Sequence, residues 1–355
     1  MHVPDGFIDA PLSAATGVVA AGAIAVSLRG ARRELGGTSR ASEAERGGER
    51  TAPLAGLVAA FIFAVQMLNF PVAAGTSGHL LGGALAAILV GPYTGVLCVS
   101  VVLLMQGILF ADGGLTALGV NITDMAITTT VVAYAVFRGL VKILPRSRRS
   151  ITAASFVAAL LSVPAAALVF TLLYALGGTT DVSLGKVATA MIGVHVLIGI
   201  GEAAITALTV GAVIAVRPDL VHGARGLEQR LKLRVDGELV DAPRPLEPVA
   251  ARDTSRRKLW VGGLVASLVL AGFVSFYASS NPDGLEKVAA DQGIDRQTKE
   301  HASADSPLAD YGVRDVEDAR LSGGLAGVIG VGVTVVAGTG VFWAVRRRRS
   351  TSQVA

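Results

Sequence analysis

The sequence predicts an all-α polytopic membrane protein, in which a bundle of seven helices is followed by a C-terminal hairpin of two helices. Hydrophobic residues make up 52% of the 355 residues and charged residues only 16%, which is too apolar for a soluble domain. Several apolar runs approach or exceed the roughly 20 residues that a helix needs to cross a bilayer. The single cysteine, Cys98, lies in one of these runs, so an intramolecular disulfide is excluded.

Nine segments are predicted to span the membrane, seven in the bundle and two in the hairpin. They cover residues 12–29, 53–70, 79–91, 93–111, 115–138, 151–176, 187–216, 259–278 and 325–345. Basic clusters follow the first, fifth, seventh and ninth spans, within 29–50, 138–149, 217–258 and 346–349. The positive-inside rule then places the N-terminus outside and the C-terminus in the cytoplasm. This placement explains the formal charge of +4 without a nucleic-acid partner, and lipid is the expected surrounding.

The third span is short, because only about a dozen residues, LLGGALAAILVG, separate His79 from Pro92. Such a helix can cross only if its outer end starts below the membrane surface, so the preceding stretch, 71–78, has to dip inward. Irregular backbone at that depth is tolerated where it is buried in protein or lines a cavity. The sequence therefore predicts an outward-facing cavity with His79 at its floor.

The chain divides into two membrane domains. Residues 1–217 form the bundle, 218–257 are polar and proline-containing and are expected to be a cytoplasmic linker, and 258–355 contain the hairpin. The outside loop of the hairpin, 279–324, has ten acidic and five basic residues. It is either a solvated loop or a lid that attracts cations.

Several polar residues lie in or beside the spans. His195 and Glu202 are seven residues apart, which places them on one side of a helix. They either brace the bundle as a hydrogen-bonded pair or act directly, since ionisable groups inside a membrane usually face a cavity or a partner. Gln66 and Asn69 come just before the dipping stretch and are expected to support it.

The first two residues form a possible metal chelate. A free α-amine has a pKa near 8 and is a good ligand once deprotonated. The amine of Met1, the backbone nitrogen of His2 and the imidazole of His2 can lie in one plane around an ion, and His79 can complete a square. Square-planar nitrogen ligation suits Ni(II) or Cu(II) and can accommodate Co(II), whereas zinc prefers a tetrahedral set.

Four stretches carry a resemblance to a known family: MHVPDGF at the start, GTSGHLLGGALAAILVGP at 75–92, LLMQGILFADGGLTALGVNITDMA at 103–126 and HVLIGIGEAAIT at 195–206. Residues 1 to about 217 resemble the CbiM/NikM substrate-binding components of energy-coupling factor (ECF) ABC transporters for cobalt and nickel. The stretch NPDGLEKVA, at 281–289, resembles the PDGLE-type module related to the small CbiN/NikN component. The chain thus looks like a fusion of the two.

The resemblance implies a site, a substrate and partners. The N-terminus would insert into the bundle and hold Ni(II) or Co(II), as transported substrate, through Met1, His2 and His79. A transmembrane coupling component and two cytoplasmic ATPases would complete the importer in a prokaryotic cell membrane, for cobalamin synthesis or nickel enzymes. The sequence has no G-x-x-x-x-G-K-[ST] phosphate loop of its own. The stretch GTSGHLLGG favours nickel-type members, while the choice of metal stays open.

The sequence fits two other classes of function less well. A membrane-embedded metalloenzyme, a metal-dependent hydrolase, would use His2, His79, His195 and Glu202. It needs an open coordination position for water, and the sequence contains no H-E-x-x-H motif. A stand-alone channel is disfavoured because a tight site does not suit fast conduction. A transporter component, and not an enzyme, is therefore expected.

Overall fold

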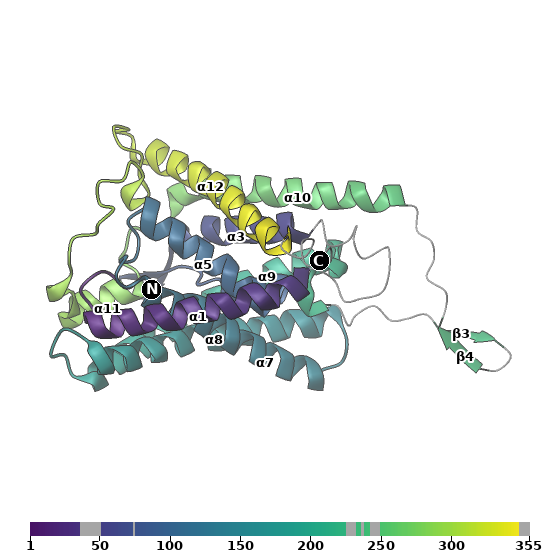
Figure 1. The fold of residues 1–355 in the computed structure, drawn as a ribbon, viewed down its shortest axis with the longest axis horizontal. Helices are drawn as coiled ribbons and strands as arrows, with labels where there is room; N and C mark the ends of the chain where they lie inside the picture. Colours follow the sequence, from purple (N-terminus) through teal and green to yellow (C-terminus); the bar gives the residue numbers. More distant parts are fainter. Residues whose placement is uncertain (36–50, 74, 225–231, 236–237, 242–248, 348–355) are drawn as a thin grey trace, which may run out of the picture.

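The computed structural model describes residues 1–35, 51–73, 75–224, 232–235, 238–241 and 249–347. Seven helices in this part of the chain are long and apolar enough to cross a membrane. They are α1 (Ala10–Leu35), α5 (Pro92–Leu109), the continuous run of α6 (Leu118–Asn121), the π-helix η1 (Ile122–Thr128) and α7 (Thr129–Ile143), α8 (Arg148–Gly177), α9 (Leu184–Val216), α10 (Val249–Gly272) with η4 (Val274–Tyr277), and α12 (Ala319–Arg347). The all-α membrane fold is thereby confirmed (Figure 1).

Two shorter apolar helices complete the bundle. Helix α3 (Thr51–Gln66) follows α1, and α4 (Gly83–Val90) lies between α3 and α5. Every residue of α4 is buried, which explains why it is apolar on all sides. With 8 residues it is about 12 Å long, so it cannot span a bilayer alone. The predicted helix at 79–91 was wrong in length, because 79–82 form no helix.

The chain nevertheless passes from one end of the bundle to the other between α3 and α5. Gln66, at the end of α3, lines the same cavity as His2. At the far end of α1, the carboxylate of Glu34 accepts hydrogen bonds from the backbone nitrogens of Tyr93 (3.2 Å) and Thr94 (2.7 Å) in the first turn of α5. The stretch predicted to dip inward is an antiparallel hairpin of β1 (Phe70–Ala73) and β2 (Thr76–Gly78), and β2 is buried.

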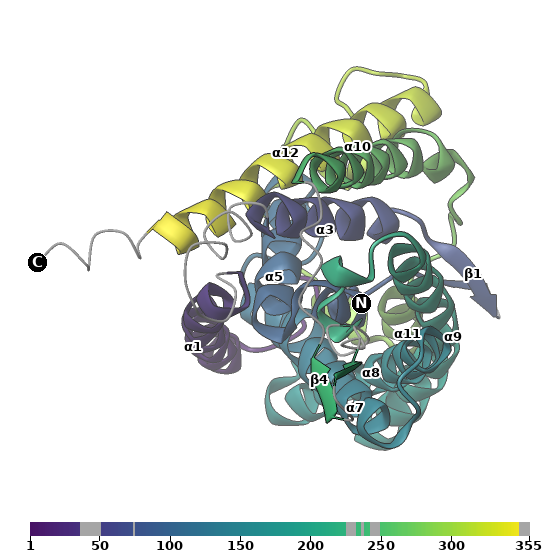
Figure 2. The same cartoon turned by 90° about the vertical axis from the view of Figure 1, so that its right-hand side faces the viewer.

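The C-terminal hairpin of α10 and α12 packs on α3, at one edge of the bundle (Figure 2). A β-carbon at Gly56 would clash with Thr339, so the glycine lets α3 and α12 approach closely. The indole nitrogen of Trp260 donates a hydrogen bond to the carbonyl of Pro53 (3.3 Å). The two hairpin helices thus pack on the bundle mainly through α3.

The segment between the two hairpin helices crosses the end of the bundle where the N-terminus lies. It contains α11 (Gly284–Gln292), η5 (Ile294–Gln297) and η6 (Ala309–Tyr311). Its backbone donates from Lys299 to the carbonyl of Asp5 (2.8 Å) and from Asp310 to that of Phe110 (2.9 Å). The acidic loop was expected to be either a solvated loop or a lid. The described contacts fit a lid over the N-terminal end of the bundle.

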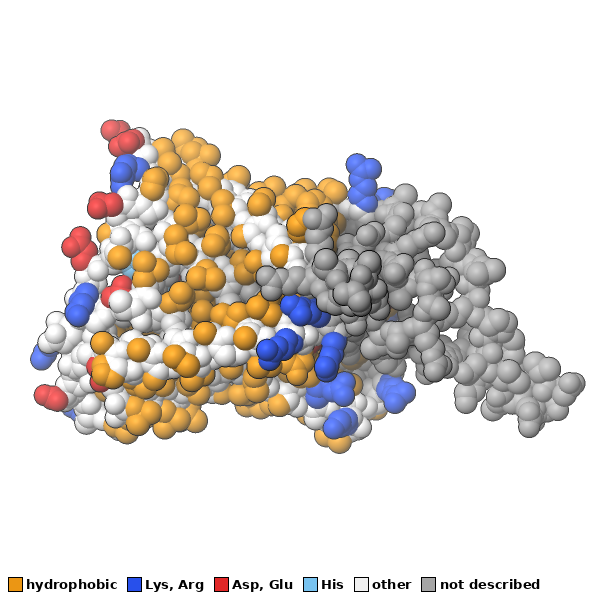
Figure 3. All heavy atoms as spheres, in the orientation of Figure 1, with side chains coloured by type: hydrophobic (Ala, Val, Ile, Leu, Met, Phe, Trp, Pro, Cys, Tyr) orange, Lys and Arg blue, Asp and Glu red, His pale blue; other side chains and the backbone are white. Residues whose placement is uncertain are grey.

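Charge is distributed unevenly along the molecule. Figure 3 shows the visible acidic side chains at the end that carries α11, and most visible basic side chains toward the opposite end. Residues 36–50 and 348–355, which hold part of the first and last basic clusters, lie outside the described residues. The linker region contains η2 (Pro218–Leu220), η3 (His222–Ala224) and the hairpin of β3 (Lys232–Val235) and β4 (Glu238–Asp241).

Candidate metal centre

The first residues of the chain are buried in the bundle. Met1 is 2% exposed and Val3 is fully buried. The side chain of Asn121 clamps the backbone of Val3, accepting from its nitrogen (2.7 Å) and donating to its carbonyl (3.1 Å). The carboxylate of Asp5 accepts hydrogen bonds from the backbone nitrogens of Leu115 and Thr116. These contacts fix the N-terminal backbone between the loop after α5 and the start of the α6–η1–α7 helix.

The turn that carries His79 is held by two side chains from neighbouring helices. The carboxylate of Glu202, on α9, accepts hydrogen bonds from the backbone nitrogens of Leu81 (2.6 Å) and Gly82 (3.2 Å). The amide of Gln66, on α3, donates to the carbonyl of Leu81 (3.0 Å). Gly82 has a φ of 90°, a conformation that glycine adopts without strain. Glu202 and Gln66 therefore position the segment that follows His79.

Two of the predicted ligands, the Met1 amine and His79, are in contact. The nitrogen of the Met1 α-amine lies 2.8 Å from Nε2 of His79. The other ring nitrogen of His79, Nδ1, lies 3.0 Å from the carbonyl oxygen of Leu80 and donates to it. The lone pair of Nε2 is therefore directed at the amine. The rings of His2 and His79 stack with centroids 5.1 Å apart.

His2 belongs to a second network of hydrogen bonds. Its Nδ1 lies 3.1 Å from a carboxylate oxygen of Asp112, and its Nε2 lies 3.2 Å from the amide oxygen of Gln106. The hydroxyl of Tyr311 donates to Asp112 (2.5 Å) and accepts from Gln106 (2.9 Å). Burial lowers the pKa of His2 from the usual 6.5 to about 4, although the charge of Asp112 acts in the opposite direction. The imidazole is thus neutral and able to bind a metal near neutral pH.

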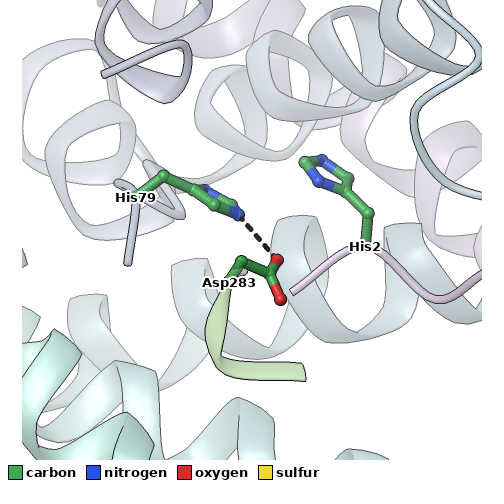
Figure 4. A group of neighbouring side chains, drawn as sticks. All are labelled: His2, His79 and Asp283. Carbon is green, nitrogen blue, oxygen red and sulfur yellow. Dashed lines mark ion pairs between the residues drawn. The ribbon is translucent and has the colours of Figure 1, made fainter. Parts of the chain in front are cut away.

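Asp283 is a further residue of this centre, which the sequence analysis missed. Its Oδ2 accepts a hydrogen bond from the Met1 amine at 2.5 Å and lies 3.5 Å from Nε2 of His79 (Figure 4). Burial raises the pKa of Asp283, but the N-terminal ammonium and His79 lower it more, so its pKa lies well below the usual range. Ligand atoms of His2, His79 and Asp283 all lie within 4.8 Å of one another. A carboxylate from the C-terminal domain therefore faces the N-terminal nitrogens.

A cavity of about 640 Å³ opens beside this centre. Its lining includes His2, Gln66, Asn69, His79, Asp112, Asp283, Glu286 and Tyr311. The backbone carbonyl of Asn69 accepts a hydrogen bond from the backbone nitrogen of Ser279 (2.7 Å). Asn69 thus joins the β1–β2 hairpin to the C-terminal domain.

His195 lies deeper in the bundle and does not join the cluster. Its Nδ1 lies 2.7 Å from the carbonyl oxygen of Met191, one turn earlier on α9. Its Nε2 is buried without a hydrogen-bond partner among the described residues. A β-carbon at Gly284, the residue after Asp283, would lie 3.2 Å from the His195 ring. His195 therefore packs beneath the Asp283 segment, while the hydrogen bonds of Glu202 go to the His79 turn.

Two family models match this sequence. The one described as "Cobalt uptake substrate-specific transmembrane region" matches residues 2–220, and the one described as "PDGLE domain" matches residues 257–347. The first spans the N-terminal segment, the His79 turn and α9. The second contains Asp283.

Known proteins match either about three fifths of this chain or a larger share of it. The chain is 39% identical over 62% of its length, and 93% of the relative's, to a provisionally named metal transport protein of Haloquadratum walsbyi. It is 36% identical over 71% of its length, and 82% of the relative's, to a protein of Archaeoglobus fulgidus provisionally named as the fused nickel transport protein NikMN. A crystal structure of a truncated transition metal transporter superposes with a TM-score of 0.51 at 25% identity, covering 61% of this chain and 99% of the other.

Proposed function

This chain belongs to the CbiM family of cobalt uptake transmembrane proteins and carries a fused PDGLE domain, and from that premise we propose that it captures Ni(II) or Co(II) outside the cell for import. Its function as a cobalt or nickel transport membrane protein follows from the family and from the relatives, which are named as transport proteins and not as enzymes. The metalloenzyme alternative is also disfavoured by Glu202. Its carboxylate is occupied by two backbone N–H groups and is not free to act as a base.

In the proposed capture state, four nitrogens surround the ion. The Met1 amine, the backbone nitrogen of His2, the His2 imidazole and His79 form the square. The observation that carries this proposal is the distance of 2.8 Å between the Met1 amine and Nε2 of His79. Neighbouring corners of a square with metal–nitrogen bonds of about 2.0 Å are about 2.8 Å apart. The present hydrogen bond thus has the length of one edge of the square.

Closing the chelate requires a rearrangement at His2. The six-membered chelate ring uses Nδ1, and this nitrogen now contacts Asp112 at 3.1 Å. The ion therefore replaces Asp112 as the partner of Nδ1. The burial of Met1 and His2 shields the complex from water once it has formed.

We propose three parts in the chain: the metal-binding domain 1–217, a cytoplasmic linker 218–257 and the two-span module 258–355. The family matches to 2–220 and 257–347 support these boundaries. The proposed orientation has the N-terminus outside and the C-terminus in the cytoplasm. The unequal placement of acidic and basic side chains at the two ends of the bundle supports it, since basic residues favour the cytoplasmic side (Figure 3).

Import then depends on partner proteins. A transmembrane coupling component and two cytoplasmic ATPases of the ECF type would bind the chain and reorient the bundle, because the sequence has no phosphate loop of its own. Protonation of the amine and imidazoles can assist release, since metal ligands must be deprotonated to bind. The delivered ion would serve cobalamin synthesis or nickel enzymes.

Uptake of radioactive nickel and cobalt tests this function. Cells that express the chain with the coupling component and both ATPases should accumulate the ions, and a chain with one extra residue before Met1 should not. Uptake that survives this extension, or that needs no ATPase, contradicts the proposed import route.

A further inference from the structure

We infer that Asp283 is a direct ligand of the transported ion, an oxygen donor that binds on the axis of the nitrogen square. This inference rests on the proposed function, because it adds a fifth ligand to those from Met1, His2 and His79. It assigns to the C-terminal domain a part in the coordination itself, beyond covering the site.

Three donor atoms already lie as neighbouring ligands of one ion would. Oδ2 of Asp283 is 2.5 Å from the Met1 amine and 3.5 Å from Nε2 of His79, and the two nitrogens are 2.8 Å apart. Around an ion with bonds of about 2.0 Å, ligand atoms at right angles are about 2.8 Å apart. The three distances lie on both sides of this value, so one ion can contact all three atoms after shifts of less than about 1 Å.

The position of Asp283 relative to the square follows from the same contacts. The amine and His79 are adjacent corners, and the other two corners belong to the backbone nitrogen and imidazole of His2. Because Oδ2 of Asp283 contacts both the amine and His79, it cannot occupy a corner and must lie above the edge that they share. That place corresponds to the axial position of a five-coordinate ion.

The protein holds Asp283 in place through its neighbours. Its other oxygen, Oδ1, caps α11 by accepting from the backbone nitrogen of Glu286 (2.8 Å). Ser77, two residues before His79, donates through its backbone nitrogen to the carbonyl of Pro282 (2.9 Å). A β-carbon at Gly284 would lie 2.7 Å from Cδ1 of Ile198 on α9, so the segment after Asp283 packs closely on that helix. Such support around a ligand is typical of metal sites.

Charge also favours a carboxylate at this position. A divalent ion bound to one deprotonated backbone nitrogen and neutral amine and imidazole groups leaves a net charge of +1. The side chain of Asp283 is 11% exposed and that of His79 only 6%, so this charge would be poorly solvated. The Asp283 carboxylate neutralises it.

An axial oxygen changes which ions the site accepts. A square of nitrogens alone selects ions that favour planar geometry, such as Ni(II) and Cu(II). Co(II) favours five or six ligands, so a fifth ligand from Asp283 extends the range of the site toward cobalt. The C-terminal domain would thereby influence metal choice.

X-ray absorption spectroscopy of the Ni(II)-loaded full chain tests the inference. Square-planar Ni(II) gives a sharp 1s-to-4p peak below the edge, which axial ligation removes. We expect no such peak for the wild-type chain and a clear peak for Asp283→Ser, because serine still caps α11 but is too short to reach the ion. Co(II) affinity should fall at least tenfold in the same variant. Glu286→Gln is the matched control, since it removes a neighbouring charge and leaves Asp283 in place.

Other outcomes separate this inference from the proposed function. A planar spectrum for the wild-type chain, or identical spectra for wild type and Asp283→Ser, overturns the axial ligand and leaves the nitrogen square intact. Nickel binding that is unchanged by an extra residue before Met1 overturns the square itself. If Asp283→Ser does not fold, Asp283→Asn keeps both the cap and the side-chain volume and should show the planar peak.

Discussion

The α-amine of Met1 donates a hydrogen bond to Nε2 of His79, 78 residues away in the sequence, at 2.8 Å. This bond exists because Nδ1 of His79 donates to the carbonyl of Leu80, which leaves the lone pair on Nε2. A metal ion can take the place of the amine hydrogen between the two nitrogens. The contact therefore connects the fold of the bundle to its proposed transport function.

Replacing His79 should abolish tight metal binding. Substitutions around a ligand already cost about 10–100-fold in metal affinity. His79→Ala removes a ligand itself, so we expect the Kd for Ni(II), measured by calorimetry, to rise by at least about 100-fold. His222→Ala is the control, because His222 lies in η3 beside Tyr134, away from this centre. An equal effect of the two substitutions would contradict the site.

Glu202 is expected to act on metal binding through the His79 turn. In Glu202→Gln, one oxygen becomes an NH₂ group and cannot accept a backbone hydrogen bond. We expect nickel affinity to fall about 10-fold or more as the turn loosens. Glu34→Gln provides a matched control, since Glu34 also accepts two backbone hydrogen bonds, from Tyr93 and Thr94, at the other end of the bundle. Both variants should lower the Tm, but Glu34→Gln should leave nickel affinity unchanged.

Acid should destabilise the metal-free protein through His2. Burial lowers the pKa of His2 from the usual 6.5 to about 4. Between these values the unfolded chain binds a proton at His2 and the folded chain does not, so the free energy of unfolding decreases as the pH falls from about 6.5 to about 4. The loss is at most about 3 kcal/mol. His2→Phe keeps an aromatic ring beside His79 and should flatten the dependence of the Tm on pH in this window; an unchanged slope would exclude His2 as the cause.

The packing of the C-terminal domain depends on a glycine in α3. A β-carbon at Gly56 would clash with both the side chain and the backbone of Thr339. Gly56→Ala should therefore separate α12 from α3 and cost about 1–3 kcal/mol, seen as a lower Tm. In Gly22→Ala the new methyl group has no atom within 4 Å, and alanine favours a helix interior more than glycine, so this variant should keep or slightly raise the wild-type Tm. Equal Tm values for the two variants would contradict this close packing.

The sequence predicted those features that depend on short stretches of the chain. The apolar runs predicted the membrane helices, and the dipeptide Met1–His2 with His79 predicted the residues that the fold brings together. The length of α4 was overestimated because LLGGALAAILVG is apolar throughout. Of its three glycines, Gly82 and Gly83 lie where the helix begins and Gly91 lies just after its end. Apolar character alone does not show where such a buried helix begins.

Asp283 was missed because its role depends on long-range packing. In the sequence it stands at the start of D-G-L-E, a pattern that predicts a helix cap, and it does form a capping box with Glu286. The same carboxylate also faces Met1, 282 residues away, through its second oxygen. Nothing in the local pattern distinguishes an aspartate that only caps a helix from one that also faces an amine.

The most direct test of the central claim is a nickel titration of the chain with one extra residue before Met1, compared with the unmodified chain. The extension converts the Met1 amine into a peptide nitrogen and breaks the chelate with His2, while the helices of the bundle remain the same. The account predicts a loss of affinity of at least about 100-fold. The Tm of the metal-free chain should also fall, because the extension removes the buried contacts of the Met1 amine with His79 and Asp283. An unchanged Kd would show that the Met1 amine is not a ligand and would contradict the proposed site.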